Sequence, residues 1–108
     1  MPMLKIRGID ESKILEVSTE LIDELEKIIG CPRDYFSMEL INSTYIMDGK
    51  KVQAPSIIEV SWFDRGQDIQ DKVAKAITKY FKTEAMPCLD IIFHNLEEKR
   101  YYENGEHF

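Results

Sequence analysis

Hydrophobic and polar positions alternate from the third residue of the chain. Leu4 and Ile6 lie on one side of residues 3–7, and the other side carries Met3, Lys5 and Arg7. Alternation with a period of two is typical of a β-strand that is buried on one face. The pattern therefore predicts a strand almost at the N-terminus, where chains more often have a few loose polar residues.

The pattern then changes to the period of a helix. Either Asp10 or Ser12 can cap its first turn. Gly30 tolerates the left-handed backbone that closes many helices, and Pro32 prevents the helix from continuing. Between these residues the apolar positions recur at intervals of three and four, and they are Ile14, Val17, Leu21, Ile22, Leu25, Ile28 and Ile29. We predict one amphipathic helix here.

The remainder of the chain repeats this alternation of periods. Asp48-Gly49 is a strong hairpin signal, because both positions accept the positive φ of a tight primed turn. We predict a strand over residues 36–46, this hairpin, a strand over 57–63, a helix from residue 69 to Met86-Pro87, and a strand over 89–93. A second turn is predicted at Asn104-Gly105.

The predicted elements form two β-α-β repeats joined by a hairpin, with the first repeat over about residues 2–46, the second over about 56–95 and a tail over 96–108. A strand, helix and strand in one sheet favour a parallel pair with a right-handed crossover. We therefore predict a single α/β (α+β) domain over residues 1–108, with a four-stranded mixed sheet and both helices on one face. The same order also fits the ferredoxin-like fold, in which strands pair antiparallel and small effectors are often bound without catalysis.

The strand positions that face away from the helices mix charge with hydrophobicity. They are Lys5, Arg7, Ser37, Glu39, Ile41, Ile57, Glu59, Ser61, Asp90, Ile92 and His94. Such a face is too hydrophobic for comfortable exposure and too charged for a dry core. It suits contact between copies of the chain around a partly hydrated centre, so we predict a homo-oligomer. The alternative is a monomer that leaves this face open to water.

Composition narrows the possible partners. The 108 residues carry a net charge of −6, and the two adjacent basic pairs lie in turn-like sequence, so we expect no nucleic-acid partner. No apolar run approaches a membrane span and the start lacks the layout of a signal peptide, which predicts a cytoplasmic protein without a membrane segment. Cys31 and Cys88 have neither C-x-x-C spacing nor a nearby histidine pair, so we expect reduced thiols and no metal site.

Pro2 is the first candidate for chemistry. If Met1 is removed, Pro2 becomes the N-terminal residue and carries a secondary amine on a rigid ring. An amine in an apolar pocket has a lower pKa than in water, because burial disfavours its charged form, and it can act as a base near neutral pH. The alternative is structural, since proline at the start of an edge strand needs no N–H donor.

Three features together carry a family resemblance. They are Met-Pro at the start, the β-α-β repeat, and the stretch Gly30-Cys31-Pro32-Arg33-Asp34-Tyr35 between helix and strand. In these the chain resembles the tautomerase superfamily, which includes 4-oxalocrotonate tautomerase, 5-carboxymethyl-2-hydroxymuconate isomerase and macrophage migration inhibitory factor. With its tail Tyr-Tyr-x-Asn-Gly-x-His-Phe, it looks most similar to an uncharacterised bacterial branch.

The resemblance implies a homotrimer with active sites at the subunit boundaries. It also implies a cofactor-independent keto–enol tautomerase or isomerase that acts on a small α-keto or enol carboxylic acid. By resemblance Pro2 is the general base, Tyr35 is a pocket tyrosine, Phe63 lies on an apolar wall, and Phe108 is a terminal aromatic near the pocket.

The chain departs from the family pattern at its cations. Cys31 stands where macrophage migration inhibitory factor has a lysine, and Ser12 and Ser37 fall near the two arginines of 4-oxalocrotonate tautomerase. These departures put the known substrates in doubt. They also keep open a non-catalytic protein of the same fold that binds a small molecule or serves in assembly.

Other cations can take over carboxylate binding. We choose Arg65, because turns between strand and helix line ligand crevices and a guanidinium holds a carboxylate with two hydrogen bonds. Arg33 is the second choice, and Lys13 also lies close in sequence to a missing cation. The alternative for Arg65 is an exposed side chain paired with Asp64 or Asp68.

Overall fold

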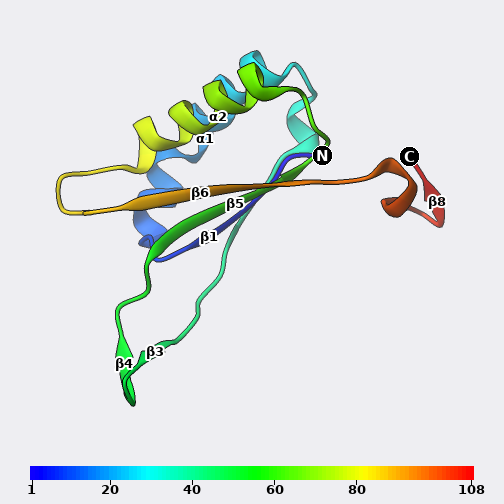
Figure 1. Ribbon diagram of the computed structural model, residues 1–108. Coiled ribbons are helices and arrows are strands. Elements are labelled where there is room, and N and C mark those ends of the chain that lie inside the picture. The colour runs from blue at the N-terminus through cyan, green and yellow to red at the C-terminus, as the bar shows by residue number, and fades with distance from the viewer.

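Two helices cover one face of a four-stranded sheet in the computed structural model, which describes residues 1–108 (Figure 1). The elements are β1 (Met3–Arg7), α1 (Glu11–Ile29), η1 (Arg33–Tyr35), β2 (Ser37–Leu40), β3 (Tyr45–Met47), β4 (Lys50–Val52), β5 (Ser56–Trp62), α2 (Gln67–Phe81), β6 (Leu89–Asn95), η2 (Glu98–Arg100), β7 (Tyr102–Glu103) and β8 (Glu106–His107). Gly30 ends α1 in the left-handed conformation, at φ 78°, as predicted.

The sheet has the order β2-β1-β5-β6. Each repeat contributes one parallel pair, β1 with β2 and β5 with β6, and the antiparallel pair of β1 with β5 joins the repeats. This confirms the mixed sheet and the β-α-β repeats. The ferredoxin-like alternative is wrong, because it requires antiparallel neighbours where the structure has two parallel pairs.

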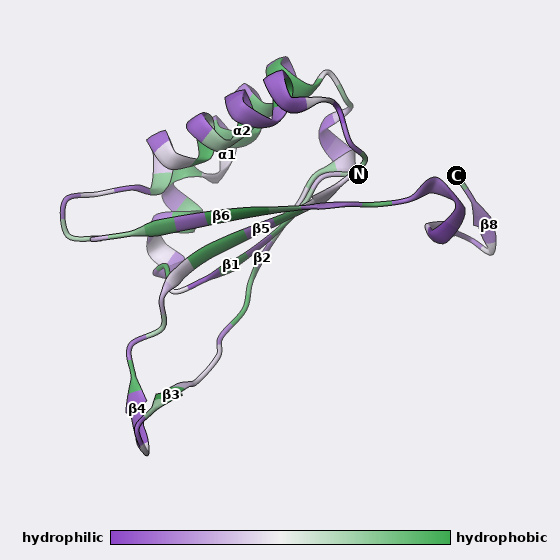
Figure 2. Ribbon diagram, viewed as in Figure 1, coloured by the Kyte–Doolittle hydropathy of each residue, from purple (hydrophilic) through white to green (hydrophobic).

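The hydrophobic core lies between the sheet and the helices. Its buried side chains are Leu4, Ile6, Ile9, Ile14, Val17, Leu21, Leu25, Ile58, Val60, Trp62, Val73, Ala76, Ile77 and Phe81. Figure 2 shows this division of the chain, with hydrophobic colour along β5 and β6 and hydrophilic colour on the outward turns of the helices. The alternation in β1 and β5 therefore directs one side of each strand into the core.

The turn after β1 is held against the segment before β5 by close backbone packing. Gly8 has φ +72°, and a Cβ added there would lie 2.2 Å from the carbonyl oxygen of Pro55. Ser56 Oγ donates a hydrogen bond of 2.8 Å to the Gly8 carbonyl oxygen. Only glycine combines this backbone conformation with so close an approach.

Two element boundaries differ from the sequence prediction. The strand predicted over residues 36–46 ends at Leu40, and residues 45–47 pair instead with β4 in a separate hairpin. The second helix ends at Phe81 and does not reach Met86. The hairpin turn itself is as predicted, since Asp48 and Gly49 have φ 52° and 75°.

Two segments extend from the body (Figure 1). We call residues 45–52 the hairpin arm and residues 96–108 the tail arm. The radius of gyration is 15.1 Å, whereas a compact chain of this length has about 13 Å. Both arms expose large apolar side chains, with Ile46 67% exposed and Tyr102 63% exposed. Neither α-helix combines the length and hydrophobicity needed to cross a membrane.

The sheet face opposite the helices carries a small charge network. Glu59 accepts a hydrogen bond of 2.9 Å from Arg7 Nη1, and its other oxygen lies 3.2 Å from His94 Nε2. Ile92 on the neighbouring strand is 43% exposed. The mixture of ion pairs and exposed apolar side chains predicted for this face is therefore present.

Candidate functional site at the start of β1

The start of β1 lies between two neighbouring strands. The Pro2 ring is fully buried, and its carbonyl oxygen accepts a hydrogen bond of 3.1 Å from the Ser37 amide. On the other side, Met3 pairs with Ser61 of β5. Residue 2 is thus fixed by the sheet, and the N-terminal amine lies at the edge of the core.

Three ionisable groups meet at this end of the sheet. The N-terminal amine of the 108-residue chain is that of Met1, and its pKa is lowered, first by burial and second by the positive charge of Arg65. Burial raises the pKa of the Cys31 thiol, while Arg65 and the amine oppose that shift. An amine with a lowered pKa carries a free lone pair in a larger fraction of molecules at neutral pH, which is what a base requires.

Arg65 has no anionic partner within the chain. It follows β5, is half-buried, and its Nε is buried without a hydrogen-bond acceptor. Asp64 accepts a hydrogen bond of 2.9 Å from the Gly66 amide and does not bind the guanidinium. The alternative of an exposed, paired Arg65 is therefore wrong. A buried N–H that lacks an acceptor is costly, so the position favours an external anion.

Phe63 and Phe108 lie together, as members of an aromatic cluster with Tyr101. The ring of Phe63 is 5.6 Å from each of the other two rings, and Tyr101 stacks on Phe108 at 4.7 Å. The Phe108 amide also donates to the Tyr101 carbonyl oxygen, at 3.1 Å. The cluster fastens the tail arm to the end of β5, two residues before Arg65.

Two predicted residues, Arg33 and Tyr35, make no contact with this group. Arg33 is exposed and its Nη1 binds Asp23 and Glu26 on α1, at 2.6 Å and 2.7 Å. These carboxylates raise the pKa of Arg33. Tyr35 is 45% exposed at the end of η1. Arg33 is therefore occupied by its own helix, and Arg65 is the cation that faces the N-terminus.

Sequence reasoning gave Cys31 no role, although the thiol belongs to the group around the N-terminal amine. The available signal was its position directly before Pro32, in the stretch that carries the family resemblance. The structure contains no group of three or more His, Cys, Asp or Glu residues arranged to hold a metal ion. The groups that meet at this end are an amine, a thiol and a guanidinium.

The fold is of the tautomerase and macrophage migration inhibitory factor type. A macrophage migration inhibitory factor homologue from Prochlorococcus marinus has a TM-score of 0.74 at 16% identity, over 98% of each chain. A fused 4-OT described as a symmetric trimer has a TM-score of 0.66 at 14% identity, over 98% of this chain and 94% of that one. At these identities the likeness concerns the fold.

The chain itself belongs to the DUF1904 family, a domain of unknown function, which it matches over residues 1–107. A crystal structure of a DUF1904 domain from Sebaldella termitidis is 38% identical, covers 100% of both chains and has a TM-score of 0.91. The comparison with curated proteins gives no match.

Proposed function

We propose that the chain is a cofactor-independent keto–enol tautomerase that acts on a small α-keto or enol carboxylic acid, with the Pro2 amine as general base. The observation that carries this proposal is the setting of the N-terminus, where burial and the unpartnered Arg65 lower the pKa of the Met1 amine and the adjacent Pro2 ring is buried. We expect an amine on Pro2 to meet the same burial and the same positive charge. The proposal requires removal of Met1, because the Pro2 nitrogen is otherwise an amide without basic character.

In the proposed reaction the neutral amine removes a proton from the carbon next to the substrate carbonyl. The electron pair of that C–H bond moves into a C=C bond, and the carbonyl becomes an enolate. The protonated amine then returns the proton to the enolate oxygen or to another carbon, so no oxidant or reductant is needed. Arg65 binds the substrate carboxylate and stabilises the developing negative charge.

The aromatic cluster supplies the apolar wall of the proposed pocket. We expect Phe63 and Phe108 to limit access of water to the amine, because their cluster lies at the end of β5, two residues before Arg65. Exclusion of water would keep the pKa of the amine low and strengthen the attraction of a carboxylate to Arg65. Tyr35, which is 45% exposed on the same end, is available to a substrate or a neighbouring subunit. Arg33 has no place in this pocket, because two carboxylates already hold it.

We further propose a homotrimer, with the sheet faces turned toward one another. Three observations support it: the mixed open face, the two arms with exposed apolar side chains, and the symmetric trimer described for a fused 4-OT of the same fold. Sedimentation equilibrium measures the assembly directly, and a monomer at micromolar concentration contradicts it.

The test of the chemistry starts from intact mass, which shows whether Met1 is removed. Exchange of the α-proton for deuterium in a panel of 2-oxo acids is then followed by proton NMR, for the wild type, Pro2→Ala and Arg65→Gln. General-base catalysis contributes about 10²- to 10⁴-fold, so we expect Pro2→Ala to slow exchange by at least about 10²-fold. Arg100→Gln, which removes an exposed arginine that pairs only with Glu97, is the matched control for Arg65→Gln.

The outcomes separate catalysis from binding alone. Retained Met1, or exchange that is equal in wild type and Pro2→Ala, refutes the general base. If the acids bind in an Arg65-dependent way without any exchange, the chain is a binding protein of the tautomerase fold. That result would support anion binding at Arg65 and refute the proposed catalytic activity.

A further inference from the structure

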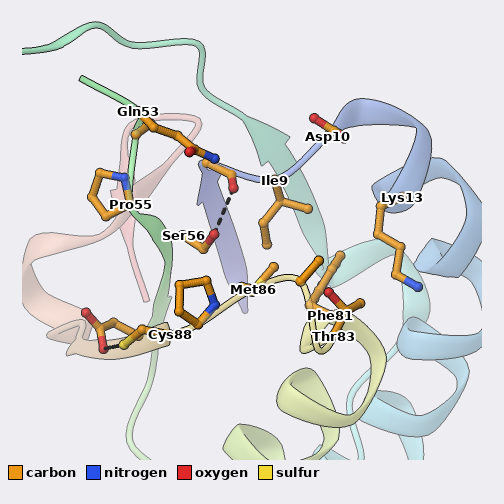
Figure 3. A pocket seen from close by; sticks show the side chains of 15 residues that line it. Ile9, Asp10, Lys13, Gln53, Pro55, Ser56, Phe81, Thr83, Met86 and Cys88 are labelled. Atoms are coloured by element: carbon orange, nitrogen blue, oxygen red, sulfur yellow. Dashed lines mark hydrogen bonds between the residues drawn. The ribbon is translucent and has the colours of Figure 1, made fainter. Parts of the chain in front are cut away.

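A hollow lies at the other end of the sheet from Pro2. Its volume is about 590 Å³, and it is enclosed by the turn after β1, the segment before β5 and the loop between α2 and β6 (Figure 3). A smaller hollow of about 230 Å³ adjoins it and shares the walls formed by residues 8–10 and 53–54. Small-molecule sites commonly have about 300 to 1,000 Å³, so the larger hollow alone is big enough for a ligand.

Apolar side chains form part of the inner surface of this hollow. Ile9 and Phe81 belong to the core, and Met86 packs against it. One wall is the close contact of Gly8 with Pro55 described above. In the loop between α2 and β6, Lys82 Nζ donates to the carbonyl oxygens of Thr83 and Met86, at 2.9 Å and 2.5 Å, and these bonds constrain the loop.

Lys13 is the uncompensated charge of this hollow. The side chain is half-buried, and it forms neither an ion pair nor a hydrogen bond within the chain. The other charges on the rim are Asp10 and Asp90, both exposed. Asp90 accepts a hydrogen bond from Cys88 Sγ at 3.4 Å. In Figure 3 Asp10 and Lys13 leave the start of α1 in different directions, with the tip of Lys13 on the side of Thr83.

We propose that this hollow binds a small organic anion, whose carboxylate pairs with Lys13 and whose apolar body covers Ile9, Phe81 and Met86. A half-buried lysine gains most from a partner that neutralises it, because it has already lost part of its hydration. The site is separate from the Pro2 amine and Arg65, so it stands whether or not the chain is a tautomerase.

The test compares three probes that share one apolar body. Hexanoate, hexan-1-ol and hexylamine are titrated into the ¹⁵N-labelled protein in its native assembly, and amide shifts are followed by NMR. We expect hexanoate to give saturable shifts at Ile9, Lys13 and Met86. Lys13→Met keeps the aliphatic part of the side chain but removes the charge. It should lower the affinity for hexanoate about 10- to 100-fold, because one charge-assisted hydrogen bond is lost. Lys75→Met, which removes an exposed lysine of α2 outside the hollow, should leave the affinity unchanged.

Each other result overturns the proposal. If hexan-1-ol or hexylamine binds as tightly as hexanoate, the hollow does not select an anion. Hexanoate shifts confined to Met1, Cys31 and Arg65 show that carboxylates bind only at the N-terminal group. Shifts that do not saturate, or an equal response in Lys13→Met and wild type, show that the hollow takes no such ligand. Ala85→Trp, which fills the loop side of the hollow, should abolish saturable binding, and retained binding contradicts the location.

Discussion

The contact between Gly8 and Pro55 makes a sharp prediction for Gly8→Ala. The new Cβ would lie 2.2 Å from the Pro55 carbonyl oxygen, a separation that Cβ atoms essentially never show, so one backbone segment must move. Movement weakens the Ser56–Gly8 hydrogen bond, which contributes about 1 kcal/mol. The left-handed conformation adds about 1 to 2 kcal/mol for any residue with a Cβ. With the lost packing around Pro55, we expect the free energy of unfolding to fall by about 3 to 4 kcal/mol.

Gly30→Ala is the matched control for this variant. Gly30 has a similar backbone conformation, at φ +78°, but a Cβ there has nothing within 4 Å. Gly30→Ala therefore carries the conformational penalty alone, about 1 to 2 kcal/mol. Urea denaturation at one fixed protein concentration measures both variants, because assembly makes stability depend on concentration. If Gly8→Ala is no more destabilising than Gly30→Ala, the close contact is not what holds the turn after β1.

Three further predictions concern charge and the tail arm. Hydrogen bonds from Arg7 and His94 lower the pKa of Glu59, so Glu59→Gln should lower stability by about 1 kcal/mol at neutral pH. The contribution of the Glu59 carboxylate to stability is fully present above the carboxylate pKa of the unfolded chain. It is lost as the pH falls through the lower pKa of Glu59 in the folded state, so the denaturation curves of variant and wild type should converge in acid. Arg65→Gln should raise the pKa of the N-terminal amine, because the cation that opposes protonation is gone; an unchanged midpoint for amine labelling against pH argues against the coupling. Phe108→Ala should speed hydrogen–deuterium exchange of the backbone amides of residues 101–107, because aromatic contacts contributing about 1 kcal/mol are lost. Equal exchange rates in wild type and variant would show that the cluster does not hold the tail arm.

The parts of the fold that could be predicted from the sequence are those set by local pattern. The period of two in residues 3–7 assigned Leu4 and Ile6 to the core, where both are buried. Asp48-Gly49 fixed a primed turn, because few other pairs accept two positive φ angles. The mixed topology also followed from the pattern, since two β-α-β units in one sheet each require a parallel pair.

Other features depend on contacts between distant residues. The second helix ends at Phe81 because the next residues form a turn in which the Met86 amide donates to the Thr83 carbonyl oxygen. The residue before Pro87 is also biased away from helical conformation. No local pattern indicated that the tail would return Tyr101 and Phe108 to Phe63.

The candidate site was predicted in part for the same reason. Position made Pro2 a candidate, and the family resemblance made it the predicted base, while Arg65 was chosen for its place in a strand-to-helix turn. In the structure the charge of Arg65 lowers the pKa of the Met1 amine. Arg33 was the second choice of cation, but it follows Pro32 in η1 and binds two carboxylates of α1. The hollow around Lys13 was not foreseen, because three loops that are distant in sequence form it.

The hairpin arm and the tail arm have a consequence for experiments on this chain. Isolated two-stranded ribbons are marginal in water, so the order of β3–β4 and β7–β8 depends on the surface that each one touches. If a second copy supplies that surface, mass action governs the arms: dilution releases them while the helix-covered core stays folded. The arms should then become sensitive to protease at low concentration and resistant at high concentration. Mixing two differently tagged populations should likewise yield hybrid assemblies at a rate set by release of the arms.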